Sequence, residues 1–115
     1  MAKTARVALI YTPLPDVETA RTIAGHLLDE RLIACANILG AMESVFVWNG
    51  KRDSARETAV LFKTDDARLD DAVARLGALH PYDTPAIVAW VCDAAHQETL
   101  GWLAAQLGPP SPDAA

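Results

Sequence analysis

A chain of 115 residues, about half of them apolar, is long enough to form one domain around one hydrophobic core. Its net charge of −5, with both signs interspersed, argues against nucleic acid, which binds basic surfaces, and against an anionic membrane surface. No apolar run reaches the ~18 residues of a membrane-spanning helix, and the apolar block at 7–11 is too short for a signal peptide. Two cysteines, Cys35 and Cys92, lie in apolar runs typical of buried free thiols, so we expect a cytoplasmic protein.

The first third of the chain predicts a strand, a helix and a second strand. Residues 6–12 are apolar and β-prone, and two prolines follow them closely. Asp16 is the expected N-cap of a helix over 17–31, whose apolar residues recur at helical spacing. Residues 32–39 are apolar except for one asparagine, which predicts a strand covered on both faces.

This second strand is expected to bend and then turn back as a hairpin. Gly40 predicts a bulge, after which 42–48 resumes as a strand rich in β-branched and aromatic residues. Asn49 and Gly50 form a strong hairpin signal, because both positions of such a turn need φ > 0. The return arm is almost all polar over 51–57, so we expect the hairpin tip to stand clear of the core.

The second half of the chain predicts a helix, a strand and a third helix. Thr64 and Asp65 are alternative N-caps for a helix whose apolar stripe comprises Leu69, Ala72, Val73, Leu76 and Leu79. Residues 80–85 contain two prolines and predict a fixed, extended linker. A strand over 86–92 and a helix over 94–107 follow. We expect a single domain over 1–108 and a disordered C-terminal tail over 109–115.

The order of these elements predicts an α+β fold. It is the ferredoxin-like βαββαβ arrangement, in which two helices cover one face of a four-stranded antiparallel sheet, with an extra C-terminal helix. Two of the predicted strands, over 33–39 and 86–91, are apolar on both faces. Because two helices cover only one of these faces, we expect the other face to be covered by self-association.

A set of residues spread over roughly positions 7–103 forms a family pattern. They are 24–28, Arg31-Leu32-Ile33-Ala34-Cys35-Ala36-Asn37-Ile38, Ser44, Trp48-Asn49-Gly50, Glu57, Lys63-Thr64, His80-Pro81-Tyr82, Pro85, Ile87 and Leu100-Gly101-Trp102-Leu103. In the order, spacing and identity of these residues the chain resembles the CutA divalent-cation tolerance proteins. The resemblance implies a ferredoxin-like protomer in a tight homotrimer, similar in build to the PII signalling proteins. The family is linked to copper and other divalent cations, and no catalytic activity is established for it in general.

Two positions depart from the family pattern. Ala86 stands where the family usually has an acidic residue, and Tyr11 stands where some members have a cysteine. At both positions this chain lacks a side chain that could bind a metal ion in relatives.

Three residues are the candidate metal ligands: His80, Cys35 and Glu57. A Cys35 thiolate would suit Cu(I), while the alternative is that it packs as a small apolar residue. His80 is either a ligand or acid–base group, or a helix C-cap whose charge suits the last carbonyls. No two of the Cys and His residues stand at metal-motif spacing. Any metal site must therefore be assembled by the fold, and a site between subunits is one option.

Trp48, Lys63 and Tyr82 are the candidate residues of a ligand cleft or an interface. Glu57 and Lys63 are six residues apart on one strand and so share a face, where Lys63 either holds an anion or forms a surface ion pair. Trp48 is either a stacking platform for a ligand or an aromatic that packs across an interface. Tyr82 follows the candidate ligand His80 by two residues.

Three functions follow from these observations. The first is a non-enzymatic, cytoplasmic homotrimer that binds or buffers divalent metal ions, copper foremost, because the sequence contains no catalytic motif and no sign of an organic cofactor. The second is a PII-like signalling module that binds a small anionic ligand in clefts between subunits. The third is a scaffold whose only property is the trimer.

Overall fold

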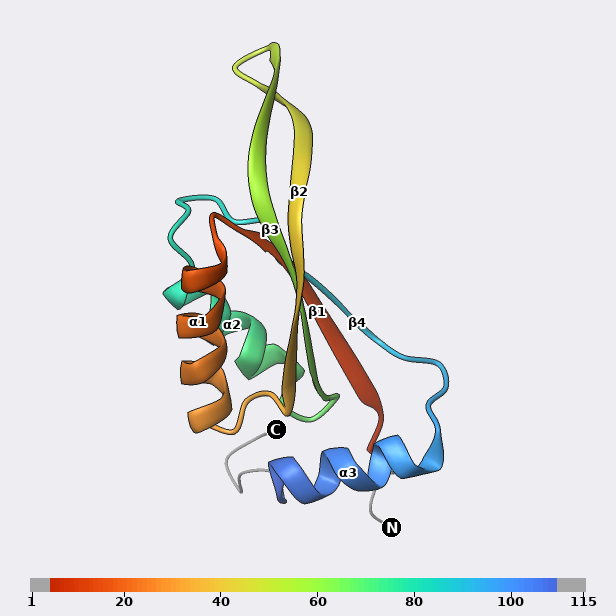
Figure 1. Ribbon diagram of the computed structural model, residues 1–115. Helices are drawn as coiled ribbons and strands as arrows, with labels where there is room; N and C mark the ends of the chain where they lie inside the picture. Colours follow the sequence, from red (N-terminus) through yellow and green to blue (C-terminus); the bar gives the residue numbers. More distant parts are fainter. Residues whose placement is uncertain (1–4, 110–115) are drawn as a thin grey trace.

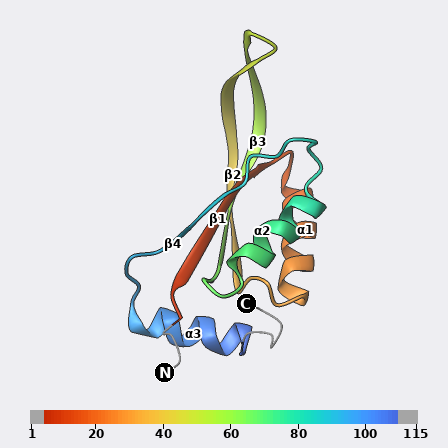
Figure 2. The ribbon, with the colours of Figure 1, turned by 180° about the vertical axis from the view of Figure 1, so that it is seen from behind.

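The computed structural model describes residues 5–109 and arranges them as a four-stranded antiparallel sheet with two helices on one face (Figure 1). The strand order is β2-β3-β1-β4, which is the predicted ferredoxin-like arrangement. A third helix lies at the end of the sheet opposite the hairpin (Figure 2). The elements are β1 (Val7–Leu14), α1 (Val17–Asp29), β2 (Cys35–Trp48), β3 (Lys51–Asp65), α2 (Leu69–Leu79), β4 (Val88–Val91) and α3 (Gln97–Leu107).

The hydrophobic core lies between the sheet and helices α1 and α2. Successive strand residues point to opposite faces, so alternate positions of β1 and β3 turn toward the helices. The buried core comprises Ile10, Leu14, Ala20, Ile23, Ala24, Leu27, Ile33, Val60, Phe62, Ala72 and Leu76. The predicted stripe of α2 is confirmed, because all five of its residues belong to this core or pack against it.

Helix α1 begins as predicted and ends two residues earlier than predicted. Asp16 is its N-cap, and the Asp16 Oδ1 accepts a hydrogen bond from the Thr19 backbone N–H at 2.7 Å. At the other end Arg31 adopts a left-handed φ of 56°, and the N–H of Leu32 donates to the carbonyl of Leu27. This closure is a Schellman motif, which stops the helix before Arg31.

Strand β2 bends as predicted. Its pairing with β3 shifts register between Ile38 and Gly40, and Gly40 has a φ of 109°. Asn49 and Gly50 both have positive φ and close the hairpin. The hairpin tip extends beyond the helices, with the Trp48 side chain 62% exposed (Figure 1). The prediction that this tip stands clear of the core is therefore confirmed.

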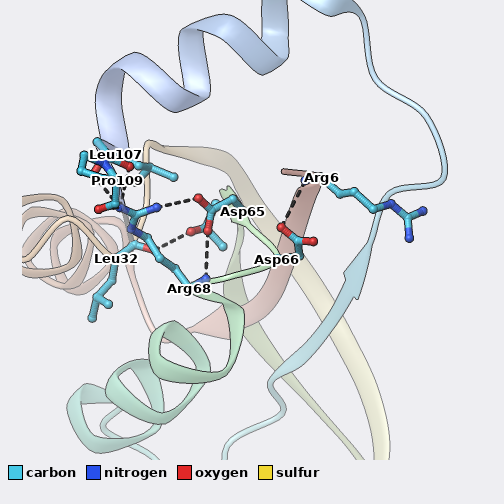
Figure 3. Close-up of polar contacts among 9 residues, drawn as sticks. Arg6, Leu32, Asp65, Asp66, Arg68, Leu107 and Pro109 are labelled. Atoms are coloured by element: carbon cyan, nitrogen blue, oxygen red, sulfur yellow. Dashed lines mark hydrogen bonds and ion pairs between the residues drawn. The ribbon is translucent and has the colours of Figure 1, made fainter. Parts of the chain in front are cut away.

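The predicted N-caps of α2 were wrong. The helix starts at Leu69 with Arg68 at the N-cap position and no side-chain cap. Thr64 and Asp65 still belong to β3, where pairing with β1 continues to residue 65. The Thr64 hydroxyl donates instead to the Leu32 carbonyl at 2.7 Å, and Asp65 accepts from the Arg68 N–H at 2.9 Å (Figure 3). Pairing between β1 and β3 therefore keeps Thr64 and Asp65 in the strand, and the helix starts after them.

The sheet face away from α1 and α2, here called the open face, is covered only at one end. It carries Leu9, Tyr11, Leu61, Lys63, Val88 and Trp90, which are cross-strand neighbours. Helix α3 packs Leu103 and Leu107 against Val7, with Leu9, Ala34, Cys92 and Leu100 around them. It starts three residues later than predicted.

Strand β4 is shorter than predicted. It covers four residues, and Val88 and Trp90 are 56% and 45% exposed. Both side chains lie on the open face. Their cover by self-association therefore stays a prediction. Of the predicted tail, residues 110–115 lie outside the described part of the chain. Over residues 5–109, no helix has the length and apolarity needed to cross a bilayer.

Candidate functional site

A hollow of about 550 Å³ lies between the hairpin and the segment that follows α2. Its walls include three of the predicted site residues, Trp48, Glu57 and Tyr82. The lining residues from the hairpin all lie on one of its two faces. After the bulge at Gly40, Met42 pairs with Glu57, so even-numbered residues of β2 share a face with odd-numbered residues of β3. The lining residues are Phe46, Trp48, Ala55, Glu57, Pro81, Tyr82, Asp83 and Thr84.

Tyr82 and Glu57 are joined within this hollow. The Tyr82 hydroxyl donates a hydrogen bond to Glu57 Oε2 at 2.8 Å. Burial, followed by this bond and the charge of Glu57, raises the pKa of Tyr82 to about 12. Tyr82 therefore stays protonated at neutral pH and connects the segment after α2 to β3.

His80 lies behind Tyr82 and is 7% exposed. Its Nε2 is 3.0 Å from both the Pro13 carbonyl and the Thr12 hydroxyl oxygen, and its Nδ1 accepts from the Tyr82 N–H at 3.2 Å. Since Nδ1 is an acceptor, these partners assign the ring proton to Nε2. The Thr12 hydroxyl in turn donates to the Ala86 carbonyl at 2.8 Å.

This network decides what His80 can do. Both ring nitrogens are already hydrogen-bonded, so neither offers a free lone pair to a metal ion. His80 does occupy the C-cap position of α2, but its ring turns to β1 rather than to the helix carbonyls. Burial lowers the pKa of His80 below its usual 6.5, which favours the neutral ring. His80 therefore holds β1 and the segment after α2 together.

Cys35 and Lys63 lie far from the hollow. They pair across β2 and β3 near the opposite end of the sheet, where the Lys63 ammonium donates to Asn37 Oδ1 at 2.7 Å. Six residues separate Glu57 from Lys63 on β3, which corresponds to about 20 Å along an extended strand. Within one chain, Cys35 cannot share a metal ion with Glu57.

The structure thus brings together Trp48, Glu57, His80 and Tyr82 and leaves Cys35 and Lys63 apart. Over residues 5–109, no three Cys, His, Asp or Glu side chains lie close enough to hold a metal ion.

Phe46 and Asp83 are among the lining residues that were not predicted as site residues. Phe46 is two residues before Trp48 in a predicted strand, so the sequence already indicated that the two side chains share a face. Asp83 was treated only as part of an extended linker, and nothing local in the sequence places that linker against β3. Among the described residues, the hollow is lined by two carboxylates, three aromatic side chains and no basic side chain, so its charge suits a cation rather than an anion.

Comparison with known proteins agrees with this fold. The family model of the CutA1 divalent ion tolerance protein matches residues 8–106. The chain is 38% identical over 95 residues to the divalent-cation tolerance protein CutA of Pyrococcus horikoshii, covering 83% of this chain and 92% of that protein.

Two further relatives extend the comparison. Protein CutA 1, chloroplastic, of Oryza sativa is 33% identical over 95 residues, covering 83% of this chain and 54% of that longer protein. The crystal structure of divalent ion tolerance protein CutA1 from Ehrlichia chaffeensis superimposes with a TM-score of 0.88 at 34% identity, covering 93% of this chain and 100% of that one. The chain belongs to the CutA1 divalent ion tolerance protein family.

Proposed function

We propose that this protein is a non-enzymatic homotrimer that binds divalent metal ions, copper foremost, and so contributes to metal tolerance. One observation carries the proposal beyond family membership. Cys35 and Glu57 both lie on the open face of the sheet, about 20 Å apart by strand geometry. A metal site that uses both needs a second copy of the chain, whose Glu57 would lie beside the first copy's Cys35.

The uncovered surface supports assembly. Trp90 and Val88 on the open face and Trp48 at the hairpin tip are large exposed apolar side chains, and β2 leaves one edge unpaired by any described strand. Exposed strand edges and apolar faces of this kind are normally covered in stable proteins. We expect each pairwise interface to bury about 1,500 Å² or more.

The choice of metal follows from the ligand types. A thiolate favours soft ions such as Cu(I), and a carboxylate broadens the choice toward harder divalent ions. Because Tyr11 and Ala86 replace ligand types found in some relatives, we expect modest affinity. The hydrogen bonds of His80 favour Cys35 and Glu57 as ligands, with His80 positioning Tyr82.

The alternative of an anionic PII-like ligand is less well supported. Lys63, its expected partner, is hydrogen-bonded to Asn37 and lies away from a hollow whose charged lining residues are both acidic. Cellular location is a separate question. The two cysteines lie in apolar runs typical of buried free thiols, which favours the cytoplasm, whereas the rice relative is named a chloroplastic protein.

Calorimetric titration with copper and zinc tests the metal proposal on protein purified without chelator or affinity tag. We expect saturable binding that is weakened in Cys35→Ser and in Glu57→Gln. The matched control is Cys92→Ser, because Cys92 packs beside α3 rather than on the free part of the open face. Binding that is equally tight in Cys35→Ser and Cys92→Ser would show that the ligand choice is wrong. No saturable binding at millimolar metal would remove the metal function itself.

A further inference from the structure

The hollow between the hairpin and residues 81–84 has a chemistry that the metal proposal does not use. We propose that it binds a small organic ammonium cation, such as a primary amine or a quaternary ammonium group. This proposal goes beyond the metal function and shares only Glu57 with it.

Aromatic side chains form much of the wall. Phe46 and Trp48 come from the same face of β2, and Tyr82 approaches from the segment after α2. The face of an aromatic ring carries partial negative charge and attracts cations within about 6 Å, and sets of such rings recognise quaternary ammonium groups. All three residues are partly exposed, so part of each side chain is open to solvent.

The charged groups of the hollow point to the same ligand class. Glu57 and Asp83 are its two carboxylic acids, and none of the Lys, Arg or His residues within 5–109 lines it. The Tyr82 hydroxyl occupies Glu57 Oε2, and among the described residues no donor is bonded to Glu57 Oε1. That oxygen is available for an ammonium N–H or for the charge of a quaternary ammonium group.

Size and ligand number argue against a single metal ion in this hollow. Its volume of about 550 Å³ lies within the range of small-molecule sites. Hard divalent ions such as calcium take about six to eight oxygen ligands. Over residues 5–109, no third Cys, His, Asp or Glu joins Glu57 and Asp83 in a group able to hold a metal ion.

The wall formed by residues 81–84 is held in place before any ligand arrives. His80 is bonded to Pro13 and to the Tyr82 N–H, and Tyr82 is bonded to Glu57. Because these contacts already order Tyr82, a ligand does not have to order it on binding, which favours affinity.

Calorimetric titration of the full-length protein with tetramethylammonium chloride, at constant ionic strength, tests the proposal. We expect saturable binding that is about tenfold weaker in Trp48→Leu and in Glu57→Gln, and about tenfold weaker for tert-butyl alcohol, a neutral analogue of similar shape. The matched control is Glu43→Gln, because Glu43 lies on β2 opposite Arg56, on the other face of the hairpin from Glu57, and its change should leave binding unchanged.

Several outcomes would overturn the inference. They are equal binding of the neutral analogue, equal weakening in Glu43→Gln and Glu57→Gln, or no saturable binding because a second copy fills the hollow. The test is separable from that of metal binding. Cys35→Ser should lose metal but bind tetramethylammonium normally. If Cys35→Ser loses both ligands together, the two sites are one and the proposal is wrong.

Discussion

Arg68 is the residue whose replacement should most clearly test how α3 is held on the sheet. Its Nη1 donates to Asp65 Oδ2 at 2.6 Å, and both side chains are about nine-tenths buried, at 10% and 9% exposed. Its Nη2 donates to the carbonyls of Leu107, Gly108 and Pro109 at 2.7, 2.8 and 2.8 Å (Figure 3). One guanidinium therefore satisfies a buried carboxylate and the carbonyl end of α3, where the helix dipole is negative.

Arg68→Met would remove these bonds while keeping a long apolar side chain. The Asp65 carboxylate would keep its bond from the backbone N–H of residue 68 but lose its counter-charge. Breaking one side of a buried ion pair usually costs about 3–5 kcal/mol. A domain of this size has a free energy of unfolding of about 5–15 kcal/mol, so the loss should be a large part of the total.

Two measurements check this prediction, both at one fixed protein concentration. Urea unfolding followed by circular dichroism gives the change in free energy. Thiol labelling in a Cys35→Ser background reports on α3, because Cys92 packs in the cluster beneath it and should react faster when the helix detaches.

The control is Arg75→Met, which removes an exposed ion pair with Glu30 at 2.9 Å. Its effect should be much smaller, because exposed pairs are screened by solvent. Adding Asp65→Asn to Arg68→Met should recover part of the stability, since it removes the unpaired charge. If Arg68→Met is no less stable than Arg75→Met, and Cys92 labelling is unchanged, the reasoning is refuted.

Three further predictions follow from the same structure. Light scattering at micromolar concentration should give a trimer, and a monomeric native protein would contradict the assembly proposal. If Trp48 packs across an interface, Trp48→Ala should weaken assembly by ~2 kcal/mol or more. Because burial lowers the pKa of His80, the unfolded chain takes up a proton at a higher pH than the folded chain does; stability should be constant above about pH 7 and fall as pH drops through 6.5 toward the folded pKa. Urea midpoints at several pH values should show this slope in the native protein and a weaker slope in His80→Asn, and identical slopes would count against it. Gly40→Ala should destabilise the hairpin by about 1–3 kcal/mol through its φ of 109°, whereas Gly25→Ala, in the middle of α1 with open space around the new methyl group, should be neutral or stabilising in the same unfolding assay.

The elements that sequence predicted well are those whose cause is local. Asp16 caps α1 through a residue three positions away, and the Asn49-Gly50 turn depends on the conformational preferences of two adjacent residues. The stripe of α2 repeats within eleven residues, and it identifies the core-facing side because packing one helix face requires that period. Because each helix and strand could be predicted from such local patterns, their order was enough to predict the ferredoxin-like sheet.

Tertiary structure alone decided the candidate site, because its contacts join residues far apart in the chain. The partners of His80 lie 67 and 68 positions away on β1, and no local pattern indicates that they would occupy its ring nitrogens. The bulge at Gly40 reverses the parity of β2, which determines that Phe46 and Trp48 share the face of Glu57. Sequence parity did place Glu57 and Lys63 on one face, but only the register of β2 with β3 shows Cys35 about 20 Å from Glu57. Residue types determined which chemistry this chain can contribute, and strand register determined which of those residues meet.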